Sequence, residues 1–300
     1  MKKNKIKDKN VINIIFMSVM GVIALIQVLM LLLPLCWAVI QSFNDSYHYV
    51  LNPFSFPTKL FDFSNYATAF KNLNITINSP SRGKVNFNIF NMTFFSFIIA
   101  FTRSFMSTIV TALLAYALSK YRHWRICRII FVVNIFVMIF PVIGSLPASL
   151  ELNRAIGRYN NIVFFLLTGY TGTGMYLMMF YGAFKGLANE YKEAAMIDGA
   201  GHYTVMLRIY FPMIFPLFAS HFLLGFMGAW NDYMTTVIWL PSYPNLAYGI
   251  FMFETLSDSR GNSTPELLAG LIIVAIPTAI LWAFSQKMVS SKLAIGGLKG

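Results

Sequence analysis

Few residues in this chain have the type and spacing that catalysis or metal binding would need. The four histidines and two cysteines are dispersed, without the spacing of metal ligands. No Ser–His or Cys–His arrangement for nucleophilic catalysis stands out, and no G-x-x-x-x-G-K-S/T loop that would hold nucleotide phosphates is present. We therefore expect no catalytic residues, no metal site and no cofactor in this chain, and no ATP hydrolysis by it.

Two charged residues, Arg103 and Asp232, lie within or at the end of long apolar segments. A charge at membrane depth is costly and usually faces a cavity or an opposite charge. At 1.5 Å per helical residue, Arg103 lies about 23 Å from the inner end of its segment at Leu118, and Asp232 lies about 30 Å beyond Pro212. Both charges should therefore lie toward the outer face. We predict that they pair or line one water-filled path; the alternative is that Arg103 reaches the lipid headgroups.

The elements that must position these residues are membrane helices. The chain has 300 residues, of which 57% are hydrophobic and 11% charged, and its mean hydropathy is +0.62. Soluble domains carry about 25% charged residues, so a cytosolic enzyme, a secreted domain and a disordered chain are excluded. The net charge of +12 could indicate nucleic-acid binding, but the basic residues gather at the ends of apolar segments. This pattern is typical of membrane topology, so we expect a lipid bilayer and no nucleic acid.

Six apolar segments are long enough to cross a bilayer, which takes about 20 helical residues. They are Val11–Val39, Phe94–Leu118, Ile126–Leu150, Ile162–Phe184, Pro212–Leu240 and Leu267–Met288. These segments predict an all-α, multi-pass protein of the cell membrane. Residues 1–10 would form a cytoplasmic tail and residues 11–300 a single transmembrane domain.

The distribution of lysine and arginine favours a cytoplasmic location for both termini, because these residues are denser in the segments that this orientation places inside. Residues 41–92 would then form an extracellular loop, packed as a cap. Residues 186–211 would form a cytoplasmic loop.

The predicted cytoplasmic loop differs from a plain connector. Asn189 can cap a short helix that contains a glutamate followed by two adjacent alanines, and an Asp-Gly pair predicts a turn after it. The alanines let the helix backbone approach a partner closely, and the glutamate offers a charge. The residues expected to make the contact are Glu193, Ala194, Ala195, Asp198 and Gly199. The element suits docking into a groove of a cytoplasmic protein; an ordinary amphipathic connector is the alternative.

The spacing of this element resembles the signature of ABC-importer permeases that work with a substrate-binding protein. The matching residues are Glu193-Ala194-Ala195, Gly199, Ile209 and Pro212, with Phe211 where the family usually has leucine. The run Trp230-Asn231-Asp232-Tyr233 resembles that of carbohydrate-type, maltose-permease-like members. The tail Gly296-Gly297-Leu298-Lys299-Gly300 is similar to the end of the same subfamily. The resemblance extends over roughly Asn91 to Gly300.

The resemblance implies the transmembrane subunit of an ATP-driven importer, with six membrane helices and a cytoplasmic coupling helix that contains Glu193. The implied partners are a second homologous permease, two ATP-binding subunits and an extracellular solute-binding protein. ATP and Mg would be held by the ATP-binding subunits. The substrate would be an oligosaccharide or another sugar, which crosses by alternating access.

The candidate substrate path consists of Arg103, Trp230, Asn231, Asp232 and Tyr233. Its aromatic side chains could stack on sugar rings at an external mouth, or they could form an interfacial aromatic belt. Two other functions stay open. Permeases for peptides or lipid-like solutes share the docking motif. A stand-alone secondary transporter would need carboxylates within the spans, for which Asp232 is the candidate.

Overall fold

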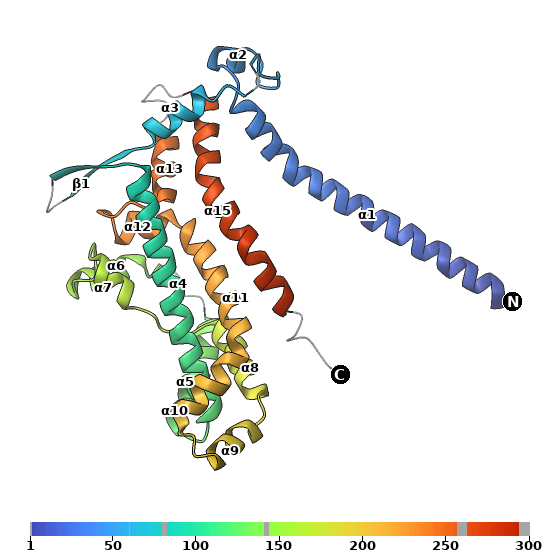
Figure 1. Cartoon of the computed structure of the whole chain (residues 1–300), viewed down its shortest axis with the longest axis vertical. Coiled ribbons are helices and arrows are strands. Elements are labelled where there is room, and N and C mark those ends of the chain that lie inside the picture. The colour runs from blue at the N-terminus through green and yellow to red at the C-terminus, as the bar shows by residue number, and fades with distance from the viewer. Residues whose placement is uncertain (1, 60, 80–82, 141–143, 257–262, 294–300) are drawn as a thin grey trace. The chain divides into compact units, whose positions relative to one another are not determined.

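The computed structural model describes residues 2–59, 61–79, 83–140, 144–256 and 263–293. The chain divides into two units, Met1–Asn72 with Glu254–Ile273, and Leu73–Phe253 with Val274–Gly300. Helices make up most of the described chain, which confirms the all-α prediction (Figure 1). The exception is an antiparallel hairpin of β1 (Ile75–Ser79) and β2 (Gly83–Phe87), which the sequence did not predict. The glycine-containing C-terminal tail of the sequence motif lies outside the described residues.

The first unit contains the long helix α1 (Lys2–Gln41), followed by α2 (Ser46–Leu51) and α3 (Ser64–Asn72). The predicted first span is one continuous helix, and its Asn13–Gln41 stretch is long and apolar enough to cross a membrane. The chain itself buries none of the apolar window of this stretch. A helix that is apolar on all sides and uncovered by its own chain needs lipid or another protein around it.

Polar side chains fasten α3 to the end of α1. Asn65 Nδ2 donates hydrogen bonds to the backbone oxygens of Ser42 and Asn44, at 2.9 and 2.8 Å. The Tyr66 hydroxyl lies 2.6 Å from Ser42 Oγ. Ser42 and Asn44 are buried, so the beginning of the predicted extracellular loop, directly after α1, is packed against α3.

The segment expected to form the cap has aromatic side chains that the rest of the first unit does not cover. Four phenylalanines stay largely exposed: Phe54, Phe56, Phe61 and Phe63. Pro53 and Pro57 lie between α2 and α3 rather than inside either helix, as a residue without a backbone N–H should.

The second unit is built around α4 (Ile89–Lys120), which packs most extensively against α11 (Phe211–Trp230) and α8 (Met175–Gly186). The remaining elements are α5 (Arg125–Ile139), α6 (Leu146–Ala155), α7 (Ile162–Leu167), α9 (Glu190–Ile197), α10 (His202–Val205), the π-helix η1 (Met206–Tyr210), α12 (Tyr233–Trp239) and α13 (Leu246–Thr255). The last two residues of α13 belong to the first unit, and the last described helix, α15 (Thr264–Leu293), also has residues in both units.

Small and polar side chains on α4 explain how closely its neighbours approach. The buried ones include Ser104, Thr108, Thr111, Ala112 and Ala115. A Cβ built on Gly225 of α11 would lie 2.8 Å from Ser104 Oγ, so the two backbones are in close contact there. Thr108 Oγ1 also lies 2.9 Å from Nδ1 of the buried His221 on α11. Small residues and interhelical hydrogen bonds hold membrane helices together, because lipid offers no hydrophobic drive for their association.

Within the described residues, α1, α4 and the His202–Trp230 stretch are long and apolar enough to cross a membrane. The first and second predicted spans are therefore confirmed as continuous helices. The fifth, Pro212–Leu240, is wrong at its end, because α11 ends at Trp230 and α12 begins at Tyr233. The sixth lies within α15. The total of six membrane helices stays a prediction.

The third and fourth predicted spans are wrong as continuous helices. The third is interrupted after α5, where Phe140 is extended (φ −90°, ψ 110°) and the next residue is a proline, which disfavours helix in the residue before it. The fourth is interrupted between α7 and α8, where Gly169, Gly172 and Gly174 have φ of +84°, +64° and +109°. Residues with a Cβ rarely adopt such φ values, so these three glycines allow the helix to break at this point.

Candidate functional site

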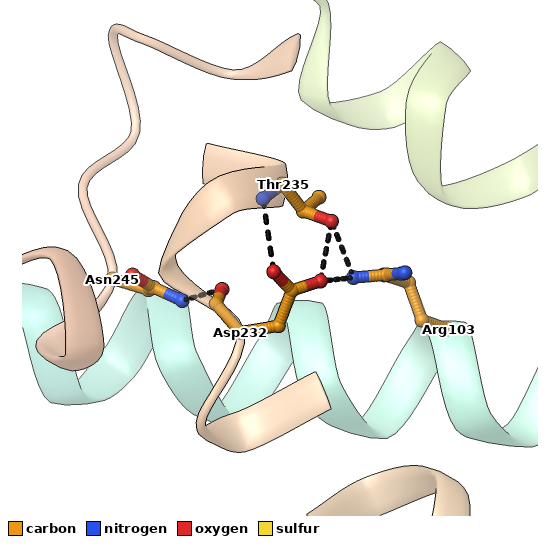
Figure 2. A network of polar contacts seen from close by, with 4 residues as sticks. All are labelled: Arg103, Asp232, Thr235 and Asn245. Carbon is orange, nitrogen blue, oxygen red and sulfur yellow. Dashed lines mark hydrogen bonds and ion pairs between the residues drawn. The ribbon is translucent and has the colours of Figure 1, made fainter. Parts of the chain in front are cut away.

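The strongest polar cluster within the second unit surrounds Arg103 and Asp232. Arg103 Nη1, on α4, donates to Asp232 Oδ2 and to Thr235 Oγ1, each at 3.0 Å (Figure 2). Asp232 lies between α11 and α12, so the contact joins the end of α11 to α4. The predicted approach of the two charges is thereby confirmed.

The carboxylate of Asp232 uses both of its oxygens in this cluster. Oδ1 accepts from the backbone N–H of Thr235 at 3.0 Å, which makes Asp232 the N-cap of α12. Oδ2 accepts from the Thr235 hydroxyl as well as from Arg103. The side chains of Arg103 and Asp232 are each 30% exposed, so the pair is partly accessible from outside the chain.

Two residues of the cluster were not predicted. Thr235 contributes a hydroxyl and a backbone N–H, and Asn245 Nδ2 donates to the backbone oxygen of Asp232 at 2.9 Å. Asn245 Oδ1 also accepts from the backbone N–H of Tyr248, at the start of α13. The available sequence signal was that Asp232 and Asn245 each stand where a helix could begin, which is typical of N-caps.

The other residues of the candidate substrate path each contact other parts of the chain. The Trp230 ring is buried and stacks on Phe226, with ring centroids 5.8 Å apart. Tyr233 stacks on Phe251 at 4.6 Å. Asn231 is exposed, and its amide donates to the backbone oxygen of Met227. The structure therefore brings Arg103 and Asp232 together, whereas the aromatic faces of Trp230 and Tyr233 already have partners.

The predicted cytoplasmic docking element forms a helix followed by a tight turn. Glu193, Ala194 and Ala195 lie on α9, and the chain reverses at Gly199, whose φ is +85°. The backbone N–H groups of Gly199 and Ala200 donate to the oxygens of Met196 and Ala195, at 3.1 and 2.9 Å. This pair of bonds is a Schellman motif, which favours glycine at the residue with positive φ. The predicted turn is confirmed.

Large apolar side chains are exposed around this turn. Ile197, directly before Asp198, is 86% exposed, and Tyr203 on α10 is 80% exposed. Leu207 and Tyr191 are also exposed, as is Glu193. Contiguous exposed apolar side chains commonly mark a protein interaction surface.

The predicted capping role of Asn189 is wrong in its detail. Asn189 occupies the N-cap position of α9, but its side chain makes no capping hydrogen bond. Asn189 Oδ1 instead accepts from Lys120 Nζ, at the end of α4, at 3.5 Å. A tertiary contact has replaced the local one.

Comparisons with known proteins agree with this architecture. The family model of the binding-protein-dependent transport system inner membrane component matches residues 108–295. The maltodextrin transport system permease protein MdxG of Bacillus subtilis is 31% identical over 206 residues, which are 68% of this chain and 73% of that protein. The diacetylchitobiose uptake system permease protein NgcG of Streptomyces coelicolor is 23% identical over 94% of this chain and 88% of its own.

A solved structure shows the same fold. A chain from the crystal structure of a bacterial ABC transporter involved in the import of the acidic polysaccharide alginate aligns with a TM-score of 0.69 at 21% identity, covering 91% of this chain and 96% of that one. The family match extends over more than half of the chain and includes the docking element, α11 and Asp232. This chain therefore belongs to the family of binding-protein-dependent transport system inner membrane components.

Proposed function

We propose that this chain is the permease subunit of an ATP-driven importer of oligosaccharides or other sugars. The observation that carries the proposal is the folded docking element, whose helix, glycine turn and exposed Ile197 and Tyr203 suit a groove on a separate ATP-binding subunit. The names of the similar permeases support sugar as the substrate class. Both termini and the docking element lie in the cytoplasm in this proposal, and the chain itself hydrolyses no ATP.

The proposed partners follow because other subunits must supply ATP hydrolysis and deliver the substrate. A second homologous permease completes the translocation path, two ATP-binding subunits hold ATP and Mg, and an extracellular solute-binding protein delivers the sugar. Closure of the ATP-binding subunits moves α9 and converts the path from inward-facing to outward-facing. In the outward state the Arg103–Asp232 pair exchanges its internal contact for sugar hydroxyls, which both charged groups can hydrogen-bond.

Co-expression with an ATP-binding subunit, the second permease and the binding protein tests the proposal. The purified complex should contain the ATP-binding subunit, and proteoliposomes should accumulate a radiolabelled oligosaccharide only when ATP is enclosed with that subunit. A panel of maltodextrins, chitooligosaccharides and oligopeptides separates sugar import from the peptide alternative. Uptake without an ATP-binding subunit would instead support a stand-alone transporter and would overturn the proposal.

A further inference from the structure

Lys120, the last residue of α4, contacts the chain on both sides of the docking helix α9, before it at Leu187 and Asn189 and after it at Tyr210. Its Nζ donates to the backbone oxygen of Leu187 at 3.2 Å and reaches Asn189 Oδ1 at 3.5 Å. Leu187 is the C-cap residue of α8, and Asn189 occupies the N-cap position of α9. The ammonium group therefore lies where the chain enters the docking element.

The same ammonium lies against the segment where the chain leaves that element. Lys120 Nζ is 4.4 Å from the centre of the Tyr210 ring, a cation–π contact. Tyr210 is fully buried and ends η1, the π-helix that joins α10 to α11. Single turns of π-helix are rare and frequently occur at functional positions.

Among the described residues, the charge of Lys120 has no carboxylate partner within ion-pair distance. Its charge is instead directed at a carbonyl at the C-terminus of α8, where a cation is favoured by the helix dipole. The Leu187 carbonyl, the Asn189 side chain and the Tyr210 ring are the groups that this ammonium contacts in the described structure.

These contacts connect the two candidate sites through one helix. Arg103 and Lys120 both belong to α4, and at 1.5 Å per residue they are about 26 Å apart along it. We infer that Lys120 is a positioning residue that transmits movement of the docking helix α9 to α4, and so to the Arg103–Asp232 pair. The inference rests on the proposed docking of α9 in an ATP-binding subunit.

The test compares transport per ATP in the reconstituted complex. Lys120→Met keeps the length and apolar stem of the side chain but removes the charge and the donor. Uptake of radiolabelled maltodextrin, or of whichever oligosaccharide of the panel the native complex takes up fastest, should fall at least about fivefold per ATP hydrolysed, the lower end of typical coupling between sites. ATP hydrolysis should persist. Lys120→Arg, which retains charge and donors, should restore the ratio.

Lys185→Met is the matched control, because Lys185 is an exposed lysine in the last turn of α8 whose side chain has no hydrogen bond or ion pair among the described residues. Its ratio of transport to ATP hydrolysis should stay at the native value. An unchanged ratio for Lys120→Met, or an equal loss for Lys185→Met, would overturn the inference. If Lys120→Met fails to assemble, Lys120→Gln, which keeps a neutral donor, is read by the same criteria.

A variant of the docking turn separates failure of this inference from failure of the proposed function. Gly199→Glu should disrupt docking itself. If Gly199→Glu lowers transport but Lys120→Met leaves the ratio unchanged, docking stands and the role of Lys120 is refuted. If neither variant changes transport and no ATP-binding subunit copurifies, the proposed function fails as well.

Discussion

Arg103 and Asp232 are 129 positions apart in the sequence, yet Arg103 Nη1 lies 3.0 Å from Asp232 Oδ2. The pair ties α4 to the junction between α11 and α12, and Thr235 holds the same carboxylate through its hydroxyl and its backbone N–H. An ion pair with both members 30% exposed contributes little to stability, about 0–1 kcal/mol. The free energy needed to separate the two side chains is therefore small, which suits a contact that closes in one transport state and opens in another.

A charge swap tests this pairing. Arg103→Asp and Asp232→Arg should each lower transport by about tenfold or more, because each places two like charges side by side, and an uncompensated charge at membrane depth costs about 2.5–3.5 kcal/mol. The double variant should recover much of the loss, as measured by uptake into proteoliposomes at equal protein levels. If Arg103 only reached lipid headgroups, Arg103→Lys would be silent and the double variant would show no recovery.

The docking turn gives a second prediction. At Gly199, with φ of +85°, a side chain costs about 1–3 kcal/mol of backbone strain. Gly199→Glu should therefore lower transport and transport-coupled ATP hydrolysis while membrane insertion stays normal. Gly201→Glu is the control, because Gly201 has a φ of −73° and open space around its Cβ position. Equal activity of the two variants would contradict a docking role for the turn.

The location of the hairpin gives a third prediction. Asn86 on β2 is exposed, and we expect this part of the chain to be extracellular. Asn86→Cys in intact cells should react with a membrane-impermeant maleimide, whereas Lys185→Cys should react only after the cells are opened. The reverse pattern would refute the proposed orientation of the whole chain.

The break between α7 and α8 gives a fourth prediction. Gly174 has φ of +109°, and its N–H donates to Asn134 Oδ1 at 2.6 Å. Gly174→Ala should destabilise the complex by about 1–3 kcal/mol, since the backbone there disfavours any side chain. Thermal unfolding of the purified complex measures the change. Gly182→Ala, within α8 and with open space at its Cβ position, should be neutral or stabilising; a similar loss there would argue against backbone strain as the cause.

The amino-acid sequence by itself determined the class of the protein and its most local motif. Apolar composition is a property of the residues, so the membrane assignment did not depend on any contact. The turn at Gly199 was predictable because positive φ is a local backbone preference of glycine. Even the approach of Arg103 to Asp232 followed from helix rise and the cost of a charge in lipid.

Only the tertiary structure decided where helices end and which polar groups meet. Asn189 has the residue type of a helix cap, but its side chain accepts from Lys120 instead, because packing brings the end of α4 beside it. The third and fourth spans contain a proline and several glycines that permit a break, but the structure decided that the helices end there rather than continue through them. Local patterns report preferences of neighbouring residues, whereas contacts between distant helices depend on how the whole set packs.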